Sequence, residues 1–175
     1  MVATFSQPVG RRQTLGSAVL LVGTLATVGT ALLFEHIGGY LPCHLCLIER
    51  WPYYIAAPLA LVTLVAAAGR ASAPTVRGLL VLIALAMLVG LGLAIYHSGV
   101  EWHAWAGPSG CTGGGTANLG GDLLSTIDAV QPPACDEAAA RFLGLSFAGW
   151  NAVASLVLAA VALWSAAVRG SRSFG

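Results

Sequence analysis

The stretch LLVLIALAMLVGLGLAIYHS, Leu79–Ser98, is twenty residues long and carries no charged side chain. At 1.5 Å per residue, a helix of this length crosses the ~30 Å hydrocarbon core of a membrane. Three further stretches are similarly apolar: Leu15–Phe34, Leu47–Ala68 and Leu145–Val168. Because backbone hydrogen bonds must be closed in lipid and the runs show no alternation, they indicate helices rather than barrel strands. The sequence therefore predicts an all-α integral membrane bundle of four helices, with no sheet.

The whole composition agrees with a membrane protein, since 57% of the 175 residues are hydrophobic and 9% are charged. The basic residues are all arginines, and six of the eight flank the N-terminus, the second loop and the C-terminus: Arg11, Arg12, Arg70, Arg77, Arg169 and Arg172. The acidic residues fall at the opposite ends of the predicted helices. By the positive-inside rule, both termini are cytoplasmic and all four cysteines lie at or beyond the outer face.

The first apolar run follows Arg11-Arg12, as in a secretory leader, but it is longer than a signal core and has no clear cleavage site. We expect a retained helix in one domain, residues 1–175, because connections this short leave the helices only each other to pack against. Small residues should allow close helix contacts in lipid: Gly23, Ala26, Gly29, Gly90 and Gly92.

The outer loop of residues 99–144 is much longer than the other connections. Trp102 and Trp105 near its start are expected to anchor at the lipid headgroups. Its glycines and prolines favour a mobile strap. Within it, the helical spacing of apolar residues in Asp122–Val130 predicts a short helix lying on the membrane.

The four cysteines form two groups along the chain, Cys43 with Cys46 and Cys111 with Cys135. An oxidising outer compartment permits disulfides, and closing a loop of about 25 residues would stabilise the fold by roughly 3 kcal/mol. A structural staple is therefore plausible for Cys111 and Cys135. A four-residue ring removes little chain entropy, so a CxxC pair is more typical of redox or metal chemistry. Four cysteines permit three pairings, all of which stay open at this point.

Pro42 before Cys43 suits a helix start, which would place Cys46 in the first turn, where free N–H groups favour a thiolate. Arg50 follows Cys46 by four residues, so its guanidinium is expected to point back at that sulfur. It would stabilise negative charge on the sulfur and on a bound electron acceptor. The alternative for Arg50 is snorkelling to the interface or pairing with Glu49.

His97 ends the third apolar run near the same outer surface. A lone interfacial histidine is more often a satisfied polar residue than a proton donor or a binding group. A zinc site built from the cysteines and nearby histidines is an alternative, but we predict no metal. Leu47 stands where c-type haem attachment requires histidine, and the arginines are too scattered to follow nucleic acid phosphates.

These residues resemble the disulfide bond formation protein B family of bacterial inner-membrane thiol oxidases. The resemblance covers nearly the whole chain and is carried by five segments: Phe34–Ile37, Pro42–Arg50, Tyr96-His97, the Cys111–Cys135 strap and Phe142–Leu145. The CxxCxxxR pattern in a four-helix frame is its most specific part. Local departures are the glycines at 113–115 and Trp51-Pro52 after Arg50. The vitamin K epoxide reductase family shares the chemistry but has the loop cysteines before the CxxC helix.

The resemblance implies a dithiol:quinone oxidoreductase of the inner membrane, with the active cysteines on the periplasmic side. A reduced thioredoxin-like, DsbA-like partner would attack Cys111, and Cys135 would then exchange with Cys43. Cys46 would leave as a thiolate and pass electrons to a bound quinone, ubiquinone or menaquinone. In the family, Arg50 assists quinone binding, and His97 matches a residue beside the quinone ring. The alternatives are a non-enzymatic membrane scaffold with a disulfide-stapled loop and a metal-binding membrane protein.

Overall fold

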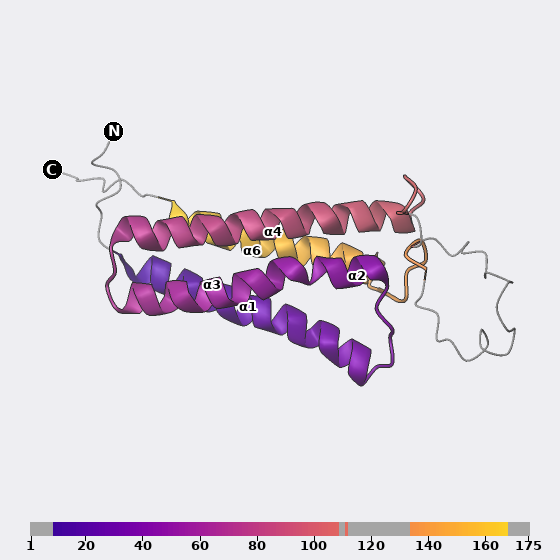
Figure 1. The fold of residues 1–175 in the computed structure, drawn as a ribbon, viewed down its shortest axis with the longest axis horizontal. Helices are drawn as coiled ribbons and strands as arrows, with labels where there is room; N and C mark the ends of the chain where they lie inside the picture. The colour runs from indigo at the N-terminus through magenta and orange to yellow at the C-terminus, as the bar shows by residue number, and fades with distance from the viewer. Residues whose placement is uncertain (1–8, 109–110, 112–133, 168–175) are drawn as a thin grey trace, which may run out of the picture.

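The computed structural model describes residues 9–108, 111 and 134–167 of the chain. Four stretches of helix in this part are long and apolar enough to cross a membrane, and the second is interrupted once (Figure 1). They are α1 (Arg11–His36), α2 with α3 (His44–Glu49 and Trp51–Ala68), α4 (Ala73–Glu101) and α6 (Phe147–Ala166). The predicted four-helix membrane bundle is confirmed. The helix predicted over 122–130 lies outside the described residues.

The second span is interrupted at Arg50, between the end of α2 and the start of α3. Pro52 follows in the first turn of α3 and has no N–H to donate to the carbonyl of Ile48. The backbone tightens there, and the N–H of Tyr53 bonds to the carbonyl of Arg50 only three residues back.

The expectation that the chain has no strand is wrong at one place, before the last helix. Arg141–Phe142 (β1) and Leu145–Ser146 (β2) form a short antiparallel pair. The two residues between them, Leu143 and Gly144, have φ angles of 52° and 83°, as a tight hairpin turn requires. The predicted helix start at Leu145 therefore moves to Phe147, where the Ser146 hydroxyl caps the helix by accepting the Gly149 N–H at 3.1 Å.

The helices pack as neighbours, with α4 against α6 and α3, and α1 against α3 and α6. The shared core contains Leu20, Tyr53, Leu80, Ile83 and Met87, each at most 2% exposed. Most other large apolar side chains on the helices face outward, which suits lipid rather than water.

The small residues predicted at helix contacts divide into two groups. A methyl group on Gly23 would lie 2.7 Å from Leu158, and one on Gly90 would lie 3.3 Å from Pro52 and Ser155. Close packing is confirmed at these two positions. At Gly29 and Gly92 nothing described lies within 4 Å, so the prediction is wrong there.

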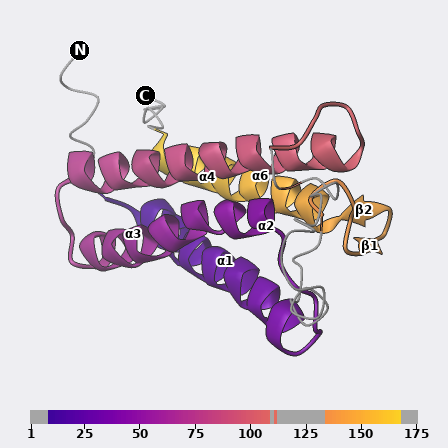
Figure 2. The same cartoon turned by 45° about the vertical axis from the view of Figure 1, so that its right-hand side comes forward.

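One end of the bundle holds the start of α1 and the end of α6, and the other holds α2 and the hairpin (Figures 1 and 2). The cysteines lie at the end that holds α2 and the hairpin. Cys43 directly precedes α2 and packs against the disulfide between Cys111 and Cys135. The arrangement gathers all four cysteines at one end of the bundle.

Candidate active site

Cys43 is the N-cap of α2, and both it and Cys46 are free thiols. The Cys43 sulfur accepts the backbone N–H of Cys46 at 3.3 Å and lies 2.9 Å from the Cys46 sulfur. Pro42 before it and the short helix after it hold the two side chains on the same turn. The sulfurs are therefore placed for a bond to form between them after modest side-chain rotation.

The environment of Cys43 favours its thiolate. The hydrogen bond from the Cys46 thiol lowers the pKa of Cys43 most strongly; burial opposes this effect, and the hydrogen bond to His97 adds to it. We predicted the negative charge on Cys46 from its place in the first helical turn. In this dithiol form, the negative charge is instead favoured on Cys43, which is the residue at the N-cap.

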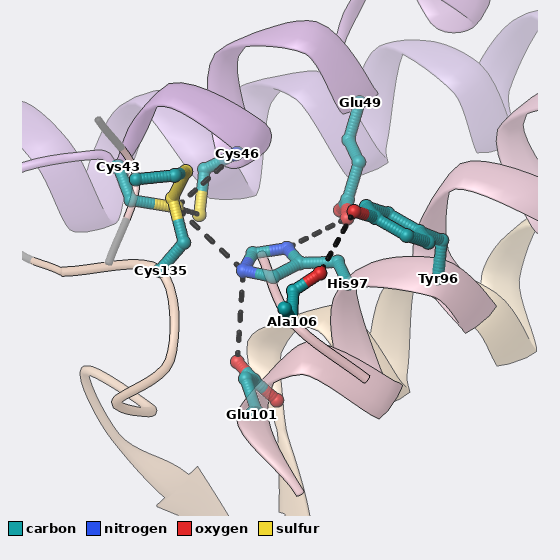
Figure 3. Close-up of a disulfide and its surroundings, with 9 residues drawn as sticks. Cys43, Cys46, Glu49, Tyr96, His97, Glu101, Ala106 and Cys135 are labelled. Atoms are coloured by element: carbon teal, nitrogen blue, oxygen red, sulfur yellow. Dashed lines mark hydrogen bonds and ion pairs between the residues drawn. A yellow bond between two sulfur atoms is a disulfide. The ribbon is translucent and has the colours of Figure 1, made fainter. Parts of the chain in front are cut away.

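His97 lies between the cysteine pair and a buried carboxylate (Figure 3). Its Nε2 atom is 3.6 Å from the Cys43 sulfur, and its Nδ1 atom is 2.7 Å from Oε1 of Glu49. Both His97 and Glu49 are buried, at 2% and 6% exposure. A carboxylate acceptor at Nδ1 leaves Nε2 free to accept a proton from sulfur. The structure thus places His97 beside Cys43, and its role as a proton donor or binding group stays a prediction.

Glu49 is held by a second group that the sequence did not single out. Asn151 of α6 donates its side-chain amide to Oε2 of Glu49 at 2.6 Å. Tyr53 donates its hydroxyl to Oδ1 of Asn151 at 2.6 Å and lies 2.8 Å from the Ser155 hydroxyl. The sequence signal that could have revealed this group is the presence of polar side chains in otherwise apolar helices. Each such side chain must find a partner when it faces the bundle interior.

Arg50 does not pair with Glu49, nor does its guanidinium bond to the Cys46 sulfur as expected. Its Nη1 atom lies 2.6 Å from Oε2 of Glu35, at the end of α1. The helix break at Arg50 turns this side chain toward α1, so the extrapolation from uninterrupted helical spacing is corrected. Arg50 and Cys46 still line the same cavity.

The loop disulfide Cys111–Cys135 is one of the three possible pairings and packs directly on the CxxC pair. Cys111 and Cys135 are 4% and 1% exposed, and they share a buried cluster with Cys43, Leu45 and Val100. Figure 3 shows Cys135 beside Cys43. The structure thus brings all four predicted cysteines together.

A cavity of about 600 Å³ opens between α1, the α2–α3 segment and α6. Its walls are mainly apolar, and the polar side chains that line it include Glu35, Cys46, Glu49, Arg50, Tyr53 and Asn151. Large apolar sites with a few convergent polar groups are typical of small-molecule binding. The cavity suits a largely apolar molecule that carries a few polar atoms.

The same cluster contains a potential metal site. One donor atom from each of Cys43, Cys46 and His97 lies within 4.8 Å of the others. Two thiolates and an imidazole supported by a carboxylate are ligands that zinc accepts. Dithiol redox chemistry and metal binding therefore remain the two chemistries that these atoms can perform.

Comparisons with known proteins give matches to a family model and to a relative. The family model described as disulfide bond formation protein DsbB matches residues 13–165. A protein of Herminiimonas arsenicoxydans named disulfide bond formation protein B is 30% identical over 157 residues, which cover 83% of this chain and 89% of the relative. No solved structure gives a significant match.

Proposed function

The chain belongs to the disulfide bond formation protein DsbB family, and on that premise we propose that it reoxidises a periplasmic, DsbA-like dithiol partner and passes the electrons to a membrane quinone. The observation that carries the proposal is the position of Cys46. It lines the large apolar cavity, while its neighbour Cys43 packs on the loop disulfide. One cysteine pair thus contacts both a second disulfide and a space for an electron acceptor.

The residues that line the cavity fit a quinone. Apolar side chains such as Phe34 and Phe147 can contact its ring and tail, and Arg50 can donate to a ring carbonyl. When bound, a quinone accepts two electrons and two protons. Glu35 holds the Arg50 guanidinium at the wall of the cavity. Ubiquinone and menaquinone both have this chemistry.

The cysteines supply the electrons by disulfide exchange. A partner thiolate attacks Cys111, breaking its bond to Cys135 and freeing the Cys135 thiolate. Cys135 then attacks Cys43 of an oxidised Cys43–Cys46 pair, and Cys46 leaves as a thiolate. The second partner thiol releases Cys111, which attacks Cys135 and frees Cys43. The partner ends oxidised, the loop disulfide is restored, and Cys43 and Cys46 are both reduced.

The covalent state of the structure corresponds to this last stage, with the loop pair joined and the CxxC pair free. In the mixed disulfide, Cys43 carries no charge, so the leaving Cys46 is the thiolate. In the dithiol, Cys43 holds the charge. The predicted role of Cys46 therefore belongs to an earlier step than the one that the structure describes.

The arginine asymmetry supports a multi-pass inner-membrane location with the cysteines on the periplasmic side. A partner dithiol in the periplasm could then reach Cys111 directly. This orientation is checked by labelling single-cysteine variants in spheroplasts with an impermeant maleimide.

The deciding experiment uses the full chain in nanodiscs with quinone and a reduced thioredoxin-like partner. We expect quinone-dependent oxidation of the partner, and Cys46→Ser should abolish it. Gly92→Ala is the control, because an added methyl group there meets no described atom within 4 Å. Partner oxidation that continues unchanged in Cys46→Ser would overturn the proposal and favour a scaffold.

Metal binding is the second candidate function, favoured by the proximity of Cys43, Cys46 and His97 donor atoms. The metal content and thiol state of the same nanodisc preparation distinguish metal binding from oxidoreductase activity. Stoichiometric zinc or copper together with four reduced thiols would favour the metal site. A metal-free protein with a Cys111–Cys135 disulfide would favour the oxidoreductase.

A further inference from the structure

The two CxxC cysteines differ in the cavities that they reach. Both line a small cavity of about 20 Å³ together with His97, but of the two only Cys46 also lines the 600 Å³ cavity. Cys46 can therefore pass electrons and its own proton directly into the large cavity, whereas Cys43 has no direct contact with that cavity.

Glu49 joins the two sides. Its Oε1 atom bonds to Nδ1 of His97 at 2.7 Å, and Nε2 of the same ring faces the Cys43 sulfur at 3.6 Å. Glu49 also lines the large cavity, where His97 does not. Of the described residues that line this cavity, Glu49 is the one with a hydrogen bond to His97.

We propose that His97 and Glu49 carry the Cys43 proton to the large cavity, so that protons and electrons leave the cysteine pair through different residues. This inference rests on the proposed function. Oxidation of the pair forms one S–S bond and releases two electrons and two protons, and the quinone is the class of acceptor that takes up both. The Cys46 proton enters the cavity from its own thiol. The Cys43 proton passes to Nε2 of His97 when Cys43 becomes a thiolate; on oxidation of the pair, the Nδ1 proton passes to Glu49, and Glu49 releases a proton at the cavity.

The other polar residues of the cavity are poorer carriers. The Arg50 guanidinium is paired with Glu35, and a guanidinium has donors but no acceptor for an incoming proton. The Tyr53 hydroxyl donates a hydrogen bond to the side-chain carbonyl of Asn151, which has no proton to exchange along such a path. Asn151 in turn donates to Oε2 of Glu49, which keeps that carboxylate oriented between His97 and the cavity. Asn151 is therefore a positioning residue.

A competing path leads outward through Glu101. Its Oε1 atom lies 3.9 Å from Nε2 of His97, and it lines the smaller cavity together with Cys43. That space is large enough for a water molecule. Glu101→Gln is consequently the matched comparison for Glu49→Gln, since both remove one buried carboxylate next to the same ring.

The first test needs no quinone. In quinone-free full-length protein, the infrared difference spectrum between the reduced and oxidised Cys43–Cys46 pair should contain a carboxyl band, because a proton moves onto Glu49. Glu49→Gln should remove this band, and Glu101→Gln should leave it in place. A band that is absent from the wild type, or lost only in Glu101→Gln, overturns the relay.

The second test follows oxidation of the reduced pair in quinone-loaded nanodiscs by stopped flow. Glu49→Gln should slow oxidation at least tenfold, because the glutamine amide can still accept the His97 N–H but cannot carry a proton. Formate, a small weak acid, should recover a large part of the rate, and Glu49→Asp should retain more activity than Glu49→Gln. Glu101→Gln should have the smaller effect.

Rates of Glu49→Gln and wild type that agree within twofold overturn the relay, as does a greater slowing in Glu101→Gln. A slow Glu49→Gln that neither formate nor Glu49→Asp improves assigns Glu49 a purely structural role. If Glu49→Gln does not fold, two other measurements test the same path. They are the oxidation rate of Glu49→Asp and the recovery of the Asn151→Leu rate by formate. Wild-type protein that does not reduce quinone refutes the proposed function instead, which distinguishes the two failures.

Discussion

Arg50 and Glu35 form an ion pair of 2.6 Å that joins the break between α2 and α3 to the end of α1. The two side chains are 13% and 22% exposed, so the pair is shielded from water more than a surface salt bridge is. Both residues line the large cavity. The pair fixes the direction of a guanidinium that would otherwise extend toward the membrane surface.

Replacing Glu35 with glutamine should therefore raise the apparent KM for quinone. The neutral amide holds the guanidinium less firmly, and a loss of about 1 kcal/mol corresponds to roughly a fivefold increase. Arg50→Ala should raise the KM further, because the donor itself is lost. Steady-state titration with quinone measures both. An unchanged KM in Arg50→Ala would contradict the binding role of this residue.

The reactivity of Cys43 should depend on pH in an unusual way. Because the hydrogen bond from Cys46 lowers the pKa of Cys43 below its ordinary value of 9.0, its thiolate should persist in mildly acidic buffer. Alkylation of Cys43 by iodoacetamide in the reduced protein should change little between about pH 6 and 8, whereas an ordinary thiol loses about tenfold per unit. Mass spectrometry of the alkylated peptide follows the rate. A tenfold loss per unit at Cys43 would contradict the prediction.

The lowered pKa of Cys43 also makes the stability of the folded, reduced protein depend on pH. The thiolate is favoured in the folded state, so its contribution is complete above the pKa of the unfolded chain and is lost as the pH falls through the lowered folded value. In reduced protein, Cys43→Ser should therefore weaken the pH dependence of the thermal midpoint on the acid side. Equal pH dependence in both proteins would show that the thiolate adds no stability.

Removing the hydroxyl of Tyr53 should destabilise the bundle. Tyr53→Phe leaves Oδ1 of Asn151 without its donor in a site where Tyr53 is 2% exposed, at a cost of about 1–3 kcal/mol. Tyr54→Phe is the matched control, because the Tyr54 side chain is 44% exposed. Thermal unfolding in detergent compares the two. Equal midpoints would mean that the Tyr53 hydroxyl contributes no net stability.

A methyl group on Gly16 should separate α1 from α6. Gly16→Ala would bring this methyl group into the side chain of Ser165, and overpacking of this kind costs about 1–3 kcal/mol. Gly29→Ala in the same helix meets no described atom within 4 Å and should be neutral or slightly stabilising. The thermal unfolding midpoints of Gly16→Ala and Gly29→Ala, each compared with the wild type, test this expectation. Equal loss in both variants would point to backbone effects rather than to the helix contact.

The helices could be predicted from the sequence because length and hydropathy alone decide whether a segment spans a membrane. Their ends were less predictable. The runs were expected at Leu79–Ser98 and Leu145–Val168, but α4 extends to Ala73–Glu101, and α6 begins only at Phe147. Helical hydrogen bonding continues past the apolar boundary until a turn or cap stops it, and the cap at Ser146 depends on the hairpin before it.

The sequence by itself determined the four spans, the two cysteine groups and the CxxCxxxR spacing that ends at Arg50, because these follow from local composition and spacing. Tertiary structure decided the partners. It paired Arg50 with Glu35 rather than Glu49, connected His97 to Glu49 and Asn151, and packed the loop disulfide on Cys43. The physical reason is that helical periodicity fixes neighbours within one segment. Contacts between segments depend instead on the break at Arg50 and on how the helices pack around it.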